Sequence, residues 1–306
     1  ASWKRRPLHR YLLRSYPSHP YPDPSVMNIQ RLGLNTVSLK FTKLEEVAAA
    51  CASAGFRTIE VPLNQLHPEL KQGMSPAQAR AIIEGHGLRV TGGFNLNLIG
   101  LGQPAERATN HDEHVKNAEL IAALGGTMMV VGTDYINWPA AKDEPDVIGK
   151  MAAAAKNVAD RIRPLGITLA IEFNWGMVKT LHAIIEIAKR SGAPNVGVLF
   201  DPAHYHSTPT KTEHINADTI GWIKHVHVDN MPATPAETTD CNTARLLPDD
   251  PRGCYDLVEL FGRFERLGYR GQYAIEMFND ELWALPPAEA AKRMFDAMQK
   301  VFSKLP

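Results

Sequence analysis

Four short apolar runs in the C-terminal half of the chain each end in a side chain that can bind a divalent metal ion. They end at Glu172, Asp201, His227 and Glu276, with helix-forming sequence between successive runs. One charged residue at the end of a buried strand is common, but four in succession indicate a shared site. Three carboxylates and one imidazole form a mostly hard ligand set, which favours Mn²⁺, Mg²⁺ or Co²⁺, with Zn²⁺ and Fe²⁺ as alternatives. Mn²⁺ is our first choice.

The elements that position these residues alternate along the chain from Met27 onward. Runs of β-branched residues predict strands at 29–35, 57–62, 88–94, 127–132, 167–172, 196–201, 223–228 and 272–277. Ala-, Leu- and charge-rich stretches predict helices at 43–54, 76–86, 106–123, 144–164, 178–191, about 213–220, 254–267 and 287–303. Eight strand–helix units with nearly continuous apolar strands predict an α/β fold, a single-domain (β/α)8 TIM barrel over residues 27–306.

An open, doubly wound sheet is the competing architecture. Such folds usually carry a glycine-rich turn after the first strand, where a nucleotide binds. Here that turn reads Asn35-Thr36-Val37-Ser38, and the chain contains no Walker or Rossmann fingerprint. A barrel is therefore favoured, and in a barrel the four metal-ligand candidates meet at the C-terminal ends of the strands.

Composition limits the class of protein. The chain has 306 residues, is 44% hydrophobic and 22% charged, and has no formal net charge, so bulk electrostatics predict no nucleic-acid partner. Residues 1–26 differ from the rest: they hold five Lys and Arg residues against one Asp and are rich in Pro, which predicts an N-terminal extension. No run is long and apolar enough to span a membrane, and the three cysteines lack zinc-site spacing. These features favour a cytoplasmic protein.

Three motifs resemble those of the xylose isomerase-like barrels over about residues 28–303. They are Asp201-Pro202-Ala203-His204, His225-Val226-His227 and the segment from Gly268-Tyr269-Arg270-Gly271 to Glu276. That superfamily includes ketose 3-epimerases, hydroxypyruvate isomerase, inosose dehydratase, 3-dehydroshikimate dehydratase and the endonuclease IV type of repair enzyme. The resemblance implies a metal-dependent enzyme acting on a small sugar or polyol, and a homo-oligomer, either a dimer or a tetramer.

The resemblance also assigns roles to particular residues. The family's four metal ligands fall on Glu172, Asp201, His227 and Glu276, its substrate-contacting histidine falls on His204, and an acidic position near the substrate falls on Glu60. We expect His225 to lie on the opposite side of its strand from His227 and to be structural. The chain departs from ketose 3-epimerases at Val178 and Ala233, which replace a glutamate and an arginine and so disfavour a simple free-ketose 3-epimerase.

Three further residues are candidate substrate contacts. Arg245 lies in a long loop over 230–253, beside Leu247-Pro248, and this segment resembles the R-x-L-P-G element of the isomerase and dehydratase branches. Its planar guanidinium could bind a carboxylate, a keto oxygen or a phosphate. Trp175 could stack on the apolar face of a sugar, and Asn95 could hydrogen-bond a hydroxyl group.

The chemistry expected of this site is proton transfer next to a carbonyl group. A divalent ion that chelates a carbonyl and its neighbouring hydroxyl acidifies the C–H between them and stabilises the resulting enediolate. With Glu172 and Glu276 as the acid/base pair, proton return gives isomerisation or epimerisation of a ketose or keto-sugar derivative. Loss of a β-substituent instead gives a dehydratase or lyase acting on a cyclic keto-polyol, a keto-acid or a 3-keto-glycoside.

Two further classes of function are less well supported. Cleavage of abasic DNA requires a three-metal cluster with histidines on early strands and a basic groove, and strands two to four end without a histidine. A non-catalytic binding subunit is the remaining alternative, which an empty metal site would favour.

Overall fold

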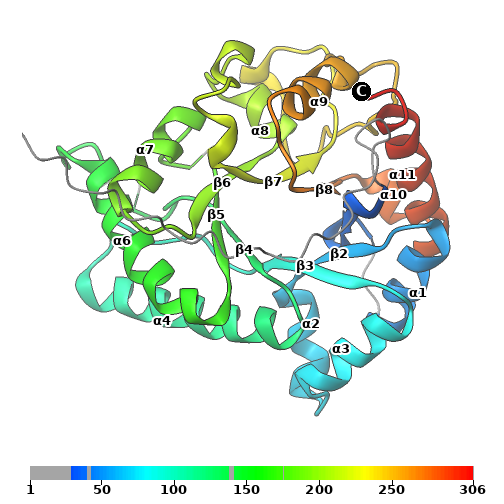
Figure 1. Ribbon diagram of the computed structural model, residues 1–306, viewed down its shortest axis with the longest axis horizontal. Coiled ribbons are helices and arrows are strands. Elements are labelled where there is room, and N and C mark those ends of the chain that lie inside the picture. The colour runs from blue at the N-terminus through cyan, green and yellow to red at the C-terminus, as the bar shows by residue number, and fades with distance from the viewer. Residues whose placement is uncertain (1–28, 40–42, 138–140, 175, 306) are drawn as a thin grey trace, which may run out of the picture.

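Short runs rich in Val, Ile and Leu form eight parallel strands, because such residues suit a sheet that helices cover. The computed structural model describes residues 29–39, 43–137, 141–174 and 176–305. Each strand pairs with the next and the first pairs with the last, which closes a barrel (Figure 1). The strands are β1 (Leu32–Asn35), β2 (Thr58–Pro62), β3 (Arg89–Phe94), β4 (Met128–Val131), β5 (Thr168–Glu172), β6 (Val196–Phe200), β7 (Ile223–Val228) and β8 (Gln272–Ile275).

Helices surround this barrel as an outer layer (Figure 1). They are α1 (Leu44–Ala54), α2 (Leu63–Lys71), α3 (Pro76–Gly85), α4 (Pro104–Ala123), α6 (Val147–Ile162), α7 (Leu181–Ser191), α8 (Pro202–Ser207), α9 (Leu257–Arg266), α10 (Asp280–Trp283) and α11 (Pro287–Phe302). Short 3₁₀ turns are η1 (Ile29–Arg31), η2 (Thr36–Ser38), η3 (Arg163–Leu165), η4 (Thr212–His214), η5 (Ile220–Trp222) and η6 (Ala236–Thr238). None of the helices in the described ranges has both the length and the apolar character needed to cross a bilayer.

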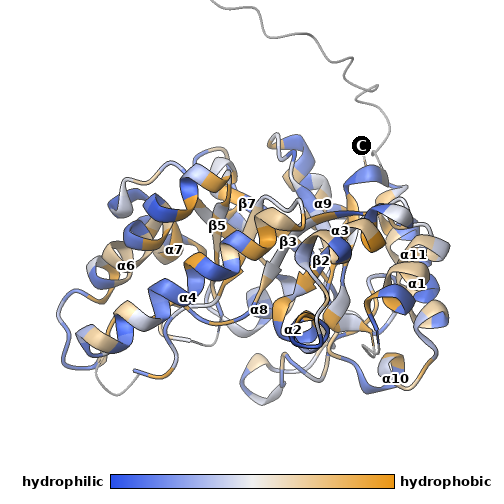
Figure 2. Cartoon of the chain, turned by 90° about the horizontal axis from the view of Figure 1, so that it is seen from below, coloured by the Kyte–Doolittle hydropathy of each residue, from blue (hydrophilic) through white to orange (hydrophobic). Residues whose placement is uncertain are grey.

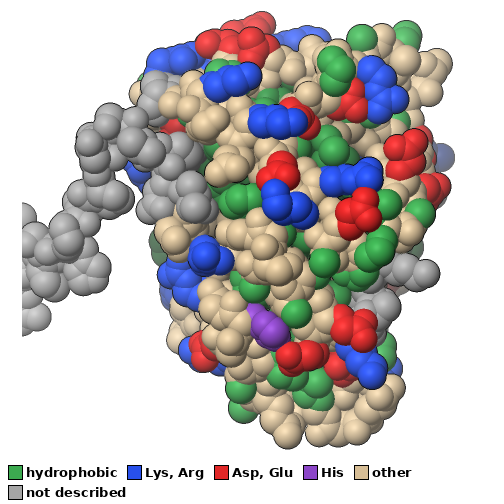
Figure 3. All heavy atoms as spheres, turned by 90° about the vertical axis from the view of Figure 1, so that its right-hand side faces the viewer, with side chains coloured by type: hydrophobic (Ala, Val, Ile, Leu, Met, Phe, Trp, Pro, Cys, Tyr) green, Lys and Arg blue, Asp and Glu red, His purple; other side chains and the backbone are tan. Residues whose placement is uncertain are grey.

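The helices pack on the barrel through apolar stripes. In α9, Leu257, Leu260, Phe261 and Phe264 are buried, which is the i, i+3, i+4, i+7 spacing of one helix face. Figure 2 shows the same division in the long helices, with hydrophilic residues on one side and hydrophobic residues on the other. On the α1 and α11 side of the molecule, acidic and basic side chains are interspersed over the surface (Figure 3). The main core therefore lies between the strands and the helices.

Alternation along each strand decides which residues face the barrel interior. In β5, Leu169 and Ile171 pack in the main core with the helices, whereas Ala170 packs in a separate small cluster with side chains of β4 and β6. Because side chains alternate between the two faces of a strand, Glu172 lies on the same side as Ala170. The same rule turns His227 inward from β7. The strands thus present their terminal polar side chains to the barrel mouth.

The barrel and its eight strands confirm the predicted fold, but two features differ from the prediction. The prediction of a helix at about 213–220 is wrong, because this segment forms the two short turns η4 and η5. The helix between β6 and β7 is α8 instead. Helix α2, which follows β2 directly, was not predicted. The predicted extension over residues 1–26 lies outside the described residues, so the domain boundary stays a prediction.

Close approach of neighbouring backbones at Gly93 in β3 leads to a prediction about stability. A Cβ atom there would lie 2.5 Å from the carbonyl oxygen of Val61 and 3.3 Å from Leu63 Cδ2. Since the strand backbone cannot move cheaply, we expect Gly93→Ala to lower the free energy of unfolding by about 1–3 kcal/mol, measured by urea denaturation. Gly85→Ala is the control, because nothing lies within 4 Å of a Cβ at Gly85. Equal stability of the two variants would contradict this account of the strand packing.

Candidate metal centre

The C-terminal ends of β5 to β8 bring four ligand-type side chains into one cluster. One donor atom each from Glu172, Asp201, His227 and Glu276 lie within 4.8 Å of one another. The Nδ1 atom of His227 is central: it lies 3.2 Å from Glu276 Oε2, 3.3 Å from Asp201 Oδ2 and 3.7 Å from Glu172 Oε1. These separations are those of atoms that could share one cation. The four residues predicted as metal ligands thus converge in space.

The four side chains differ in their exposure to solvent. Asp201 and His227 are 0% and 2% exposed, whereas the side chains of Glu172 and Glu276 are 12% and 11% exposed. The two glutamates are therefore the members of the cluster that a molecule entering the mouth can reach. This difference separates residues that could only hold an ion from residues that could also exchange a proton with a substrate.

Concentrated negative charge dominates the electrostatics of the cluster. Burial and the neighbouring charges of Asp201 and Glu276 raise the pKa of Glu172 well above its usual value. Burial alone would lower the pKa of His227, but the carboxylates of Glu276 and Glu60 outweigh it and raise that pKa well above the usual value. Both shifts have the same origin, because buried like charges repel and a buried imidazole next to them attracts a proton.

The chemistry of the donor set fits a divalent cation. Glu172 Oε1 is buried and, among the described residues, has no hydrogen-bond partner. A buried carboxylate oxygen without a partner is costly. A cation bound between the four side chains would satisfy this oxygen and offset the repulsion between the carboxylates. Residues Glu172, Asp201, His227 and Glu276 could therefore hold the ion.

Glu60 lies behind His227 rather than at the barrel mouth. Its side chain is 1% exposed, and its Oε2 atom accepts hydrogen bonds from Nε2 of His225 at 2.8 Å and from Nε2 of His227 at 3.2 Å. The predicted substrate contact at Glu60 stays a prediction, and the structure places this carboxylate between two imidazoles. A carboxylate that accepts Nε2–H of His227 fixes the tautomer that leaves Nδ1 free for an ion.

His225 also differs from its prediction. Its ring packs against that of His227 at 5.4 Å between centroids, and both rings contact Glu60. The expectation that His225 faces the opposite side of β7 is wrong, because residues two apart on a strand share a face. The close grouping of Glu60, His225 and His227 is accounted for by these hydrogen bonds.

Arg245 is buried among the carboxylates of the cluster. Its side chain is 1% exposed, and its Nη1 atom lies 2.9 Å from Asp201 Oδ2, 2.6 Å from Asp229 Oδ2 and 3.0 Å from Glu276 Oε2. Burial raises the pKa of Asp201, but the attraction of Arg245 together with that of the neighbouring histidines outweighs burial and holds this pKa well below its usual value. The predicted substrate-binding role of Arg245 stays a prediction, and in the structure its Nη1 atom compensates the charge of three carboxylates.

Asp201 also positions His204. Its Oδ1 atom accepts hydrogen bonds from the backbone N–H groups of Ala203 at 2.7 Å and His204 at 3.3 Å, which caps the start of α8. Nε2 of His204 lies 3.6 Å from Glu172 Oε2. Burial lowers the pKa of His204 to about 4, so its ring is neutral near pH 7. His204 therefore borders the cluster, as its predicted role at the substrate requires.

The structure gives less information about the other predicted substrate contacts, Asn95 and Trp175. Asn95 follows β3, and its Nδ2 atom donates to Asn117 Oδ1 at 3.2 Å. Trp175 lies outside the described residues. Asn35 was missed by the sequence analysis: its Nδ2 atom donates to Glu276 Oε1 at 2.7 Å and to Glu60 Oε1 at 3.2 Å. The sequence did contain a signal for Asn35, because it is a polar residue at the end of a predicted strand, as the four metal-ligand candidates are.

Comparisons with known proteins bear on the family and the fold of the chain. The family model described as "Xylose isomerase-like TIM barrel" matches residues 48–301. An inosose isomerase of Halalkalibacterium halodurans is 26% identical over 150 residues, which are 46% of this chain and 50% of that protein. A 3-dehydroshikimate dehydratase of Pseudomonas aeruginosa is 27% identical over 260 residues, 82% of this chain but only 38% of that protein. The chain thus spans half or less of these two relatives.

Among solved structures, the fold is similar to that of the IolI protein with a bound zinc atom. The TM-score is 0.79 at 20% sequence identity, over 90% of this chain and 99% of that one. At this identity the likeness concerns the fold. The zinc atom belongs to that structure.

Metal content tests the cluster directly. We expect protein purified without chelator to carry about one divalent ion per chain by elemental analysis, and Asp201→Asn to lose most of it, because an amide oxygen is a weaker ligand than a carboxylate. Asn can still cap α8, so the fold should persist. Asp218→Asn, the same change at an exposed position, is the control and should retain the ion. Undiminished metal in Asp201→Asn would refute the assignment.

The role of Glu60 gives a second prediction. Glu60→Gln removes the carboxylate that accepts Nε2–H of His227 and should weaken metal affinity about 10–100-fold, as found for partners of metal-binding histidines. A competition titration against a chelating dye measures the change. Glu84→Gln, on the exposed face of α3, should leave the affinity unaltered. If both variants bind metal equally well, Glu60 does not orient His227.

Proposed function

Because the chain belongs to the xylose isomerase-like TIM barrel family, we propose that it is a divalent-metal-dependent isomerase or epimerase of a ketose or keto-polyol. The observation that carries this proposal is the convergence of Glu172, Asp201, His227 and Glu276 at the barrel mouth, with only the two glutamates reaching solvent. Mn²⁺ is our first choice of ion, and the zinc in the IolI structure makes Zn²⁺ the first alternative to test.

An ion held by these four residues would polarise a ketone and its neighbouring hydroxyl group, which makes the C–H between them acidic enough for a carboxylate base. The chain's own residues supply the proton transfers. Glu172 would bind the ion through Oε1, the oxygen without a hydrogen-bond partner, and its side chain is 12% exposed, so we assign it the role of accepting the proton from carbon. Glu276 is held by Asn35 at 2.7 Å and by Arg245 at 3.0 Å, and returns a proton from a fixed position.

Charge around the cluster supports an uncharged substrate. Four acidic side chains that are at most 12% exposed, those of Glu172, Asp201, Asp229 and Glu276, surround the site, and Nη1 of Arg245 is in contact with three of them. This concentration of carboxylates would repel a substrate carboxylate or phosphate. A neutral keto-polyol, the kind of molecule that an inosose is, meets no such repulsion. We therefore favour a ketose or keto-polyol over a keto-acid.

A dehydratase is the second candidate. Its supporting observation is the match to 3-dehydroshikimate dehydratase, which covers 82% of this chain against 46% for the inosose isomerase. The same base would remove the proton next to the ketone, and the electron pair would then expel a β-hydroxyl group with a proton from Glu276 or His204. Nothing in the metal-ligand geometry separates the two outcomes, so the product must decide.

Proton exchange in D₂O tests the reaction and separates the alternatives. With a panel of ketoses and inososes, we expect deuterium to enter at the carbon next to the ketone without loss of substrate mass. Loss of one water from the substrate would favour the dehydratase. Removal of the base should slow exchange about 10²–10⁴-fold in Glu172→Gln. Glu281→Gln, at an exposed position on α10, is the control. Full exchange activity in Glu172→Gln would exclude its role as the base.

A further inference from the structure

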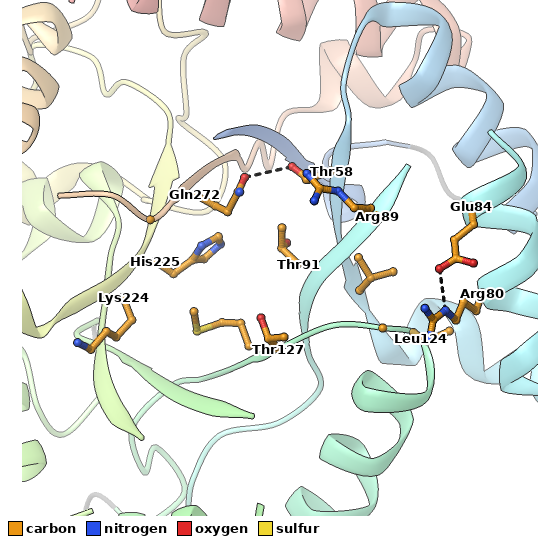
Figure 4. A pocket seen from close by; sticks show the side chains of 14 residues that line it. Thr58, Arg80, Glu84, Arg89, Thr91, Leu124, Thr127, Lys224, His225 and Gln272 are labelled. Carbon is orange, nitrogen blue, oxygen red and sulfur yellow. Dashed lines mark hydrogen bonds and ion pairs between the residues drawn. The ribbon is translucent and has the colours of Figure 1, made fainter. Parts of the chain in front are cut away.

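A cavity lies at the end of the barrel opposite to the metal cluster. Its volume is about 390 Å³, and it is lined by residues at the N-terminal ends of several strands, among them Thr58 of β2, Arg89 of β3, Lys224 of β7 and Gln272 of β8. Figure 4 shows Gln272, His225, Thr91 and Thr127 around a common space, with Arg89 beside Thr58. We call this space the basal cavity. It shares no residue with the four proposed metal ligands.

Positive charge predominates in the lining of the basal cavity. The cationic side chains are Arg80, Arg89 and Lys224, and the acidic one is Glu84, so three positive charges stand against one negative charge. Glu84 is engaged with Arg80 at 2.7 Å. Within the described part of the chain, no carboxylate forms an ion pair with Arg89. This excess is local, because the chain as a whole has no formal net charge.

Neutral hydrogen-bond donors accompany these cations. The Oε1 atom of Gln272 accepts a hydrogen bond from Thr58 Oγ1 at 3.3 Å, which leaves the amide nitrogen of Gln272 to donate to a ligand. The hydroxyl group of Thr127 also lines the cavity. Lys224 Nζ donates to the carbonyl oxygen of Gly221 at 2.6 Å and has two further N–H bonds to offer. Donors and positive charge together are the recognition chemistry of an oxyanion.

We propose that the basal cavity binds a small phosphate-bearing anion, either inorganic phosphate or a phosphorylated molecule of a few carbon atoms. Arg89 supplies a planar, permanently charged fork for the phosphate oxygens, and Gln272 and Thr127 supply neutral donors. Lys224 adds positive charge from the edge of the cavity, across from Arg89 (Figure 4). A cavity of about 390 Å³ exceeds the space of a phosphate ion alone, since a water molecule takes roughly 30 Å³ of liquid, so a short organic group fits beside it. This site binds its anion whatever reaction the metal centre catalyses.

The basal cavity is linked to the metal cluster by hydrogen bonds through the barrel interior. His225 lines the cavity, and its Nε2 atom donates to Glu60, which also accepts from His227. The two sites are nevertheless separate. A phosphate that bound at the mouth would contact the metal ion, whereas one at the base would contact Arg89. Variants at either end can therefore tell the two locations apart.

Calorimetric titration of the metal-loaded protein with inorganic phosphate and, separately, with glycerol 3-phosphate tests the proposal, with glycerol as the blank. We expect binding of at least one phosphate ligand, and the double variant Arg89→Gln/Lys224→Gln should weaken it about tenfold or more, since hydrogen bonds to charged groups are typically worth that much. Tighter binding of glycerol 3-phosphate assigns the cavity to an organic phosphate, and tighter binding of inorganic phosphate assigns it to the free ion.

Two control variants make the outcome decisive. Arg293→Gln removes an exposed cation from α11, outside the cavity, and should leave phosphate affinity unchanged. Asp201→Asn, which weakens the metal cluster, should also retain phosphate binding. The proposal is overturned if neither phosphate binds, if binding survives in the double variant while its thermal unfolding is unchanged, or if binding disappears in Asp201→Asn, which would place the anion at the metal ion.

Discussion

The structure around the barrel mouth depends on keeping several carboxylates close together away from water. Glu172, Asp201 and Glu276 place oxygens around one imidazole nitrogen, and Asp229 lies behind them. Buried like charges at such separations are tolerated only when opposite charge stands between them. Arg245 supplies one such charge through a single nitrogen shared by three carboxylates. The remaining repulsion is what a divalent cation would neutralise.

Two side chains sealed from solvent, those of Arg245 and Glu60, contact the residues of the cluster from inside the barrel. Nη1 of Arg245 lies beside Asp201 and Glu276, and Glu60 accepts a hydrogen bond from His227. The charge and the orientation of the cluster are therefore set from within the barrel, whereas His204 borders the cluster beside Glu172.

Much of this arrangement was predictable from the sequence. The alternation of side chains along a strand predicts which last residues point into the barrel, and parallel strands all end at the same face of the barrel. The proximity of Glu172 and Glu276 therefore follows from the local sequence together with the fold class. The environment of Arg245 did not follow, because the loop over 230–253 returns to the cluster through contacts between residues far apart in the chain. The helix predicted over 213–220 was wrong for a related reason. Its helical pattern was weak, and the segment forms short polar turns around Thr219 instead. The side of β7 on which His225 lies was predictable, because residues two apart on a strand share a face and His225 therefore lies on the side of His227.

The two oxygens of Asp201 serve different parts of the molecule. Oδ2 faces His227 and Arg245 in the cluster, while Oδ1 holds the first N–H groups of α8. A single rigid carboxylate therefore couples the electrical state of the mouth to the placement of the helix that carries His204. The carboxylate that would hold the ion is thus also the one that fixes the first turn of the helix beside the cluster.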